Sequence, residues 1–180
     1  MLIVIRHGQA ENNISKVYNS NPASPGYKPL NLTPQGIQQI KKTAVELLAK
    51  GYNDSNIAAV FVSPMPRAKQ TAEECVQSGL FSEKKIIIDP RITELQAGDL
   101  EGKPVLPVWS RAIAQINHAE TEDQVKERVN SFYQQLLHQF PQGNIVVITH
   151  GFPGEILIQV AAHKDVKLQV GEAQIIPLRG

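Results

Sequence analysis

The chain has 180 residues, which is enough for one domain with a complete core and short for two. Its net charge of +1 gives no broadly basic surface, so we expect neither nucleic acid nor a membrane as a partner. Cys75 is the only cysteine, which excludes an internal disulfide and favours a reducing compartment. The apolar start ends at Arg6, too early for a signal peptide or a membrane span, and a cytoplasmic location is expected.

Hydrophobic periodicity and turn residues predict strands that alternate with helices along the chain. Thr33 is the expected N-cap of the first helix, Pro34 its first residue and Gly51 its end. A later helix is expected to begin at Thr121, where Thr121 and Gln124 match a capping box. In chain order, the expected elements are a strand at 2–5, a helix between 34 and 51, a strand at 57–62, a helix at 66–79, a strand at 86–88, a helix from 121, a strand at 145–149, a helix at 153–162 and an edge strand at 173–177.

Two segments carry turn residues and show no clear periodicity. Residues 19–32 are rich in proline and are expected to form an irregular surface segment. Residues 93–117 are equally irregular, with a short helix expected around 109–116. Because strands alternate with helices elsewhere, the sequence predicts an α/β fold, a three-layer α/β/α sandwich that forms one domain over residues 1–180.

Charged or titratable side chains follow four of the expected strands. Arg6 and His7 follow the first strand, and His150 follows the strand at 145–149. Arg67 lies just beyond the second strand, and Glu94 lies beyond the third. Because the carboxyl ends of parallel strands meet at one edge of a sheet, where open α/β sheets bind ligands, we expect these side chains to share a crevice. The coincidence carries more weight than any one residue, since a lone Arg-His-Gly tripeptide is a weak signal.

These residue types suit phosphoryl transfer. Arg6 and Arg67 can bind phosphate oxygens through paired N–H groups. Neutral His7 has a lone pair for in-line attack on phosphorus, which gives a phosphohistidine, and His150 can donate to the transferring oxygens. Glu94, kept protonated by burial or by the nearby anion, can protonate the leaving alkoxide and then deprotonate the attacking water. This chemistry needs no metal and no cofactor, so neither is expected.

Five motifs connect the chain with a known family. In chain order they are RHGQAENN at 6–13, LTPQG at 32–36, SPMPRAKQTA at 63–72, ELQAGDLEG at 94–102 and THG at 149–151. On these motifs, which span nearly the whole chain, the protein resembles the histidine phosphatase superfamily and its phosphoglycerate-mutase-like branch. Gly151 follows the second histidine where the acid-phosphatase and phytase branch has Asp, and this points away from that branch.

The resemblance also implies a role for individual residues. It makes His7 the phosphorylated nucleophile and Glu94 the proton donor. It implies further groups that bind the phosphate or the rest of the substrate, namely Arg6, Arg67 and His150 in the phosphate pocket, with Asn13 and the Gly151 backbone as auxiliary contacts. Two departures concern this pocket: Gln9 stands where family members often have Glu, and Lys28 where many have Asp.

The leading hypothesis is a metal-independent phosphomonoesterase that acts through a phosphohistidine on a small phosphorylated metabolite. The alternative is a phosphoglycerate mutase. Residues 103–120 disfavour it, because this region is short beside that of mutases and offers only Lys103 and Arg111 to hold a carboxylate. A third hypothesis, an inactive phospho-ligand-binding protein of this fold, is disfavoured because the core residues of the motifs are all present. The sequence leaves the substrate and the oligomeric state open.

Overall fold

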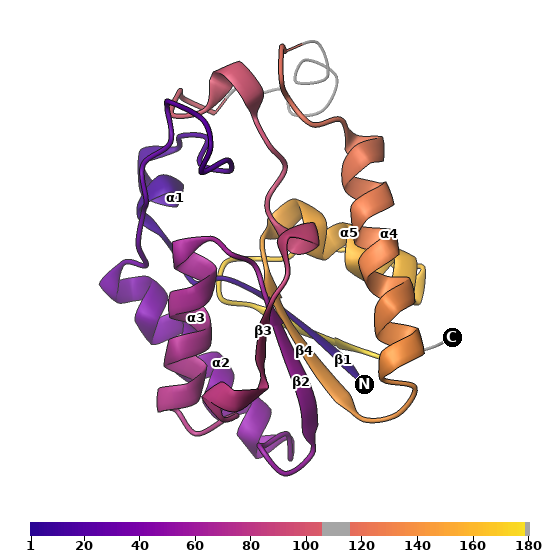
Figure 1. The fold of residues 1–180 in the computed structure, drawn as a ribbon. Coiled ribbons are helices and arrows are strands. Elements are labelled where there is room, and N and C mark those ends of the chain that lie inside the picture. Colours follow the sequence, from indigo (N-terminus) through magenta and orange to yellow (C-terminus); the bar gives the residue numbers. More distant parts are fainter. Residues whose placement is uncertain (106–115, 179–180) are drawn as a thin grey trace.

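A computed structural model describes residues 1–105 and 116–178, and its centre is a 5-stranded sheet with the strand order β3-β2-β4-β1-β5 (Figure 1). Four strands run parallel, and β5 lies antiparallel to β1 at one edge. The expected strand positions are confirmed to within a residue or so. The strands are β1 (Leu2–Arg6), β2 (Ile57–Val62), β3 (Ile86–Ile88), β4 (Asn144–Thr149) and β5 (Ala173–Ile176).

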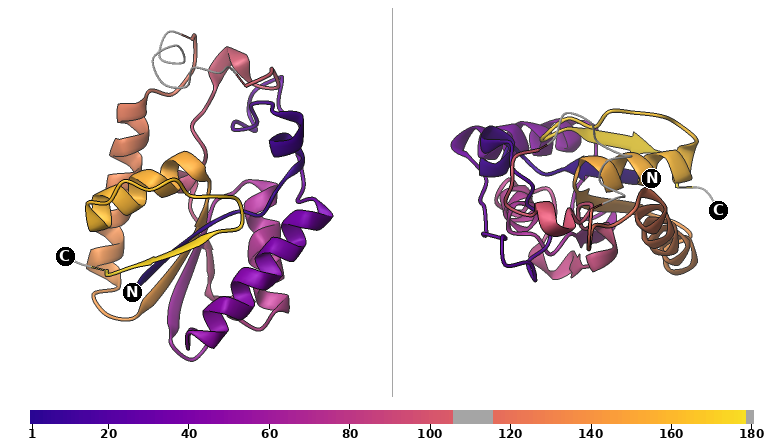
Figure 2. Two further views of the ribbon diagram at one scale, coloured as in Figure 1. Left: turned by 180° about the vertical axis from the view of Figure 1, so that it is seen from behind. Right: turned by 90° about the horizontal axis from the view of Figure 1, so that it is seen from above.

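Helices cover both faces of the sheet, which confirms the three-layer α/β/α sandwich. Figures 1 and 2 show α2 and α3 on one face and α4 and α5 on the other. The α-helices are α1 (Glu11–Ser15), α2 (Pro34–Ala49), α3 (Pro66–Gln77), α4 (Glu122–Gln139) and α5 (Gly151–Ala162). Short 3-10 helices are η1 (Glu83–Lys85), η2 (Pro90–Ile92) and η3 (Gly98–Leu100). Within residues 1–105 and 116–178, no helix has both the length and the apolar character that crossing a membrane would require.

The two core layers follow from the alternation of side chains along β1. Leu2 and Val4 pack with buried residues of α4 and α5, whereas Ile3 and Ile5 pack with buried residues of α2 and α3. All four side chains are fully buried. A strand that is buried on both faces must be apolar at every position, which is why 2–5 is a continuous apolar run.

The N-terminus of α2 is fixed against the loop that follows β1. Thr33 caps the helix as expected, its Oγ1 accepting a hydrogen bond from the backbone N–H of Gly36 at 3.0 Å. A Cβ on Gly36 would lie 2.0 Å from the carbonyl oxygen of Gln9, and a Cβ on Gly8 would lie 2.5 Å from the carbonyl oxygen of Gly36. Only glycine at these positions allows the helix to lie directly on the chain next to His7.

The structure differs from the expectation in three places. The helix α1 lies where the sequence predicted only a loop, and α5 begins directly at Gly151 instead of at Pro153. The segment 19–32 has no helix or strand, as expected, but it is not wholly on the surface, because Asn19 and Ser20 are buried. The helix expected around 109–116 falls largely on residues outside the described ranges.

Candidate active site

The carboxyl ends of β1 and β4 bring two histidines together. The strands pair in register from Leu2 with Ile145 to Arg6 with Thr149, and His7 and His150 follow directly. The backbone N–H of His7 continues the ladder by donating to the carbonyl of Thr149 at 3.0 Å. The two imidazole rings meet edge to face, with their centroids 5.1 Å apart. The sheet therefore brings together the two residues that the sequence placed at one edge.

His7 is held as a neutral imidazole with a defined tautomer. Its Nδ1 lies 2.7 Å from the carbonyl oxygen of Gly8, which can only accept, so Nδ1 carries the proton. Its Nε2 accepts a hydrogen bond from Nε of Arg67 at 3.0 Å. Burial, together with the charge of Arg67, holds the pKa of His7 well below its usual value of 6.5. The hydrogen bonds thus assign the lone pair to Nε2.

Arg67, in the first turn of α3, is a buried cation without a carboxylate partner among the described residues. Its side chain is 1% exposed, and burial lowers its pKa to about 10, so it is still charged at neutral pH. Nη1 and Nη2 donate to the side-chain and backbone oxygens of Asn19, both at 2.9 Å. The Asn19 amide is itself fixed, because its Nδ2 donates to the carbonyl of Lys28 at 2.7 Å. A buried cation that only neutral groups satisfy is suited to receive an anion.

Arg6 supplies a second guanidinium. Its Nη1 donates to the carbonyl of Leu168 at 2.8 Å, while its Nε is buried and has no partner among the described residues. Gly151 explains how the guanidinium fits, because a Cβ there would lie 3.2 Å from Cζ and Nη1 of Arg6. The glycine after the second histidine therefore makes room for the arginine before the first.

His150 is fully buried, and one of its ring nitrogens has no hydrogen-bond partner among the described residues. Its Nε2 lies 2.8 Å from Oγ of Ser63, the residue that follows β2. Its Nδ1 is buried with no hydrogen-bond partner in the described part of the chain. Burial and the charge of Arg67 hold the pKa of His150 well below 6.5, so the ring is neutral. When Ser63 donates to Nε2, the ring proton resides on Nδ1, which is then an unused donor.

Glu94 lies beyond β3 and η2, in a stretch without regular secondary structure. One carboxylate oxygen accepts a hydrogen bond from the backbone N–H of Leu95 at 3.0 Å. Burial raises the pKa of Glu94, and this effect outweighs the hydrogen bond from Leu95 and the charges of Arg67, Arg6 and Arg128, which lower it. The carboxyl is thus biased toward its protonated form relative to an exposed glutamate.

Four of these residues, Arg6, His7, Arg67 and Glu94, line a cavity of about 440 Å³. Among the described residues, its wall carries the cations Arg6, Arg67 and Lys16 and one carboxylate, that of Glu94. The cavity is thus suited to an anionic ligand. The remaining lining residues are His7, Asn12, Asn13, Val17, Tyr18, Asn19, Ser20, Leu95 and Val105.

Two of the predicted site residues lie off this wall. Gly151 lines a second cavity, of about 280 Å³, that shares Arg6 and Glu94 with the first. His150 contacts His7 but is not among the described residues that line either cavity. Asn13 does line the first cavity, although its Oδ1 already accepts a hydrogen bond from the backbone N–H of Ala10 at 2.9 Å.

The outer wall of the cavity is held by a buried glutamate. Both oxygens of Glu101 accept hydrogen bonds from Ser20 at 2.8 Å, one from its backbone N–H and one from its hydroxyl. The chain segments also cross at two glycines. A Cβ on Gly26 would lie 2.3 Å from the carbonyl oxygen of Glu101, and Gly102, with φ +76, lies against Gly26 in turn. We call the two hydrogen bonds between Ser20 and Glu101, together with the glycine crossing, the Ser20–Glu101 clamp. It joins the segment 19–32 to the segment 97–103.

Sequence reasoning missed Asn19, Ser63, Ser20 and Glu101 as parts of the site. Asn19 contacts Arg67, 48 positions away, and no local pattern marks it, whereas Ser63, whose partner His150 is 87 positions away, begins the recognised motif at 63–72. Glu101 belongs to one of the recognised motifs, and that was the only available signal. The described residues contain no group of three or more His, Cys, Asp or Glu side chains that is placed to hold a metal ion.

Comparison with known proteins confirms the resemblance. Residues 2–171 match the model of the histidine phosphatase superfamily (branch 1). A 2,3-bisphosphoglycerate-dependent phosphoglycerate mutase of Mesorhizobium japonicum is 27% identical over 94% of this chain and 87% of its own length. The sedoheptulose 1,7-bisphosphatase of Saccharomyces cerevisiae is 33% identical over 56% of this chain and 36% of its own length.

The fold has close counterparts among solved structures. The product of open reading frame Rv3214 of Mycobacterium tuberculosis superposes with a TM-score of 0.73 at 19% identity, covering 96% of this chain and 88% of its own. At this identity the likeness concerns the fold alone, and it agrees with the sheet and helix layers described above. With the family model matching almost end to end, the chain belongs to the histidine phosphatase superfamily.

Proposed function

We propose that this protein is a metal-independent phosphomonoesterase that acts on a small phosphorylated metabolite through a phosphohistidine at His7. One observation carries the proposal: neutral His7 directs Nε2 at the buried guanidinium of Arg67, which has no carboxylate partner among the described residues. A nucleophile and an unpaired cation in contact are what attack on a phosphate monoester requires.

Phosphate binding prepares the nucleophile in this scheme. The phosphoryl oxygens accept hydrogen bonds from Arg6 and Arg67, the latter turning its Nε donor from His7 to the anion. The Nε2 lone pair is then free for in-line attack. The Nδ1 of His150, which has no partner among the described residues, is a further donor on the ring that meets His7 and can stabilise the charge that develops on the phosphoryl oxygens.

Two displacements complete the reaction. In the first, the Nε2–P bond forms, the P–O bond to the leaving group breaks, and that oxygen takes the proton of Glu94. In the second, a water oxygen bonds to phosphorus, the N–P bond breaks and returns its electron pair to Nε2, and Glu94 accepts the proton of the water. The Gly8 carbonyl, which accepts from Nδ1, supports the positive charge of the phosphorylated ring. The raised pKa of Glu94 supports its role as the acid.

The test is turnover with the nucleophile present and absent. In the presence of a metal chelator, the protein is expected to release phosphate from an aryl phosphate and from members of a phosphorylated metabolite panel. Labelled substrate should give an acid-labile phosphoenzyme. His7→Ala should lose both activity and label while keeping the wild-type circular dichroism spectrum, since the lone pair in contact with Nε of Arg67 is that of His7 Nε2. Substantial activity in His7→Ala would remove His7 as the nucleophile.

A second candidate is a phosphoglycerate mutase, favoured by the relative of that name from Mesorhizobium japonicum. A mutase returns the phosphoryl group to its substrate before water reaches it. Among the described residues of the cavity wall, Lys16 is the only cation besides the two arginines that could hold a substrate carboxylate. Isomerisation of phosphoglycerate that depends on a bisphosphoglycerate primer, and that exceeds hydrolysis, would favour the mutase. Absence of both activities would favour a binding protein of the same fold.

A further inference from the structure

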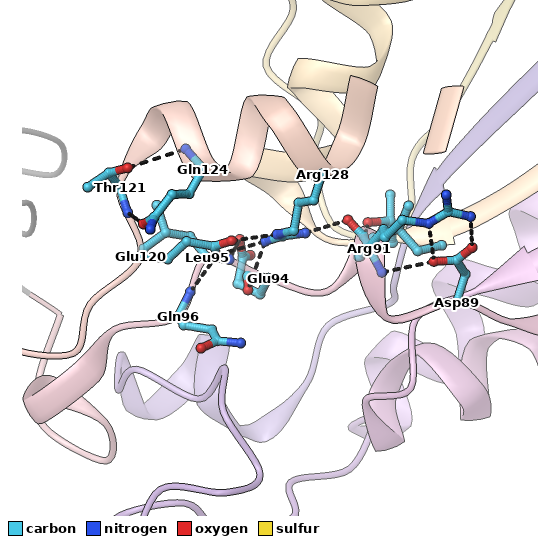
Figure 3. A network of polar contacts seen from close by, with 11 residues as sticks. Asp89, Arg91, Glu94, Leu95, Gln96, Glu120, Thr121, Gln124 and Arg128 are labelled. Atoms are coloured by element: carbon cyan, nitrogen blue, oxygen red, sulfur yellow. Dashed lines mark hydrogen bonds and ion pairs between the residues drawn. The ribbon is translucent and has the colours of Figure 1, made fainter. Parts of the chain in front are cut away.

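The backbone around Glu94 is held by contacts with distant parts of the chain, namely side chains and one backbone hydrogen bond from Glu120 to Gln96, and not by a helix or strand of its own. Residues 94–96 lie between η2 and η3 and belong to no helix or strand. Figure 3 shows that this stretch is bordered by a network of polar contacts that reaches it from α4. A carboxyl group that must meet a leaving oxygen needs a fixed backbone, so the source of this rigidity bears on function.

Arg128 of α4 is the centre of the network. Its Nη1 donates to the carbonyl oxygen of Arg91 at 2.5 Å, and its Nη2 lies 3.4 Å from the carbonyl oxygen of Glu94. Its Nε and Nη2 also donate to the two carboxylate oxygens of Glu120, at 2.6 and 2.9 Å. Glu120 in turn accepts a hydrogen bond from the backbone N–H of Gln96 at 3.2 Å. The Arg128–Glu120 pair thus holds the chain on both sides of Glu94 (Figure 3).

The pair is buried enough to be rigid. The side chains of Arg128 and Glu120 are 18% and 13% exposed, and the bidentate geometry fixes the guanidinium plane. The helix that carries Arg128 is anchored by the buried residues Val125, Val129 and Phe132. The Glu94 carboxylate bonds to the N–H of the very next residue, Leu95, so its direction follows the backbone that Arg128 holds.

We propose that Arg128, paired with Glu120, is a positioning residue that holds the Glu94 carboxyl in place for proton transfer to the leaving group. The inference rests on the proposed function and adds to it a residue outside the cavity wall. If it is correct, disturbing Arg128 should slow phosphoryl transfer from a substrate whose leaving group needs the proton of Glu94 far more than transfer from a substrate whose leaving group departs without it. Leaving-group dependence separates these two effects.

Arg128→Lys is the main variant, because it keeps the positive charge beside Glu120 but cannot reproduce the fork that reaches two carbonyl oxygens. The matched control is Arg91→Lys. The Arg91 guanidinium lies in the same network and binds Asp89 and Gln135 at 2.5 and 2.6 Å, but it makes no hydrogen bond to residues 94–96. Both variants replace a partly buried, carboxylate-paired arginine, so a general loss of stability should appear in both.

For Arg128→Lys we expect turnover of an alkyl phosphate to fall by about 10-fold or more, since a small misplacement of a catalytic group can cost about 100-fold. The pre-steady-state burst with an aryl phosphate of low leaving-group pKa should change by less than about 2-fold, because that group departs without a proton. Arg91→Lys should change both rates by a similar, small factor. Arg128→Lys added to Glu94→Gln should cause no further loss on the alkyl phosphate, since the proton is already gone.

Equal losses of Arg128→Lys on the two substrates, or full additivity with Glu94→Gln, would overturn the inference. If Arg128→Lys does not fold, the double variant Arg128→Met/Glu120→Gln removes both charges together and avoids leaving one buried alone. The same comparison then applies to it. A wild-type protein that hydrolyses neither substrate would instead refute the proposed function, so the two failures are distinguishable.

Discussion

The contact between Gly151 and Arg6 gives a prediction about phosphate binding. In Gly151→Ala the new methyl carbon would lie 3.2 Å from the Arg6 guanidinium carbon. Ordinary carbon contacts are about 3.5–4.0 Å, so the guanidinium must move by roughly 0.3–0.8 Å. Its hydrogen bond to the Leu168 carbonyl, 2.8 Å long, resists that movement. Gly151 is the first residue of α5 and does not have a positive φ, so its backbone accepts alanine and the fold should survive.

We expect the displaced guanidinium to lower the affinity for phosphate. A hydrogen bond to a charged group contributes about 1.5–3 kcal/mol. Losing part of one, about 1 kcal/mol, should raise the Kd of inorganic phosphate about 5-fold. Isothermal titration calorimetry measures this Kd, and KM for an aryl phosphate should rise in parallel. Gly79→Ala is the control, because Gly79 has φ +77 and open space around it, so alanine strains only the backbone. It should lower Tm and leave the Kd unchanged.

Two results would refute this reasoning. Wild-type phosphate affinity in Gly151→Ala would mean that Arg6 does not hold the anion from its present position. An equal loss of affinity in Gly79→Ala would mean that the change in Kd reflects general destabilisation and not the displaced guanidinium.

Three further predictions concern the same pocket. Glu94→Gln should slow alkyl phosphate turnover by about 10²–10⁴-fold yet spare the aryl phosphate burst, and equal losses in stopped-flow traces would make Glu94 structural. Because His7 and His150 have pKa values well below 6.5 in the folded state, the unfolded chain binds more protons below that pH, so the free energy of unfolding should fall as pH drops through this range. Urea titrations at several pH values should show that the free energy of unfolding depends less on pH in His7→Asn, and an unchanged pH dependence would contradict the assignment. Inorganic phosphate at about 100 times the Kd of the wild-type protein should raise the wild-type Tm by about 5–11 °C. An equal rise in Arg67→Lys at the same phosphate concentration would exclude Arg67 as a ligand.

The sequence predicted best those features that depend on local pattern. The apolar parts of β1 and β4, residues 2–5 and 145–148, are short and mostly β-branched, as expected of strands that are buried on both faces. Thr33 and Thr121 cap helices through bonds to residues only three positions away, so their patterns are visible in the chain. The helix α1 was missed because none of its five residues is buried, and it therefore has no apolar periodicity.

The site itself was predictable only in part, for a different physical reason. The strand ends made it possible to place His7 and His150 at one edge, since the topology of parallel strands is regular. Asn19, by contrast, lies in an irregular segment and accepts a hydrogen bond from the guanidinium of Arg67, and only the folded chain brings these two residues together. Arg128 lies on a helix whose pattern was read correctly, but its partners are backbone carbonyls 34 and 37 positions away.

The Ser20–Glu101 clamp has a consequence for how this protein can change. The sheet edge that carries His7 is part of a cooperative core, whereas the facing wall consists of two irregular segments joined by one carboxylate and a glycine crossing. Replacements along that wall can alter the room beside the phosphate without disturbing the strands. Directed evolution toward a new substrate should therefore vary 16–18 and Val105 while keeping Asn19, Gly26 and Glu101, so that the reactive centre is inherited unchanged.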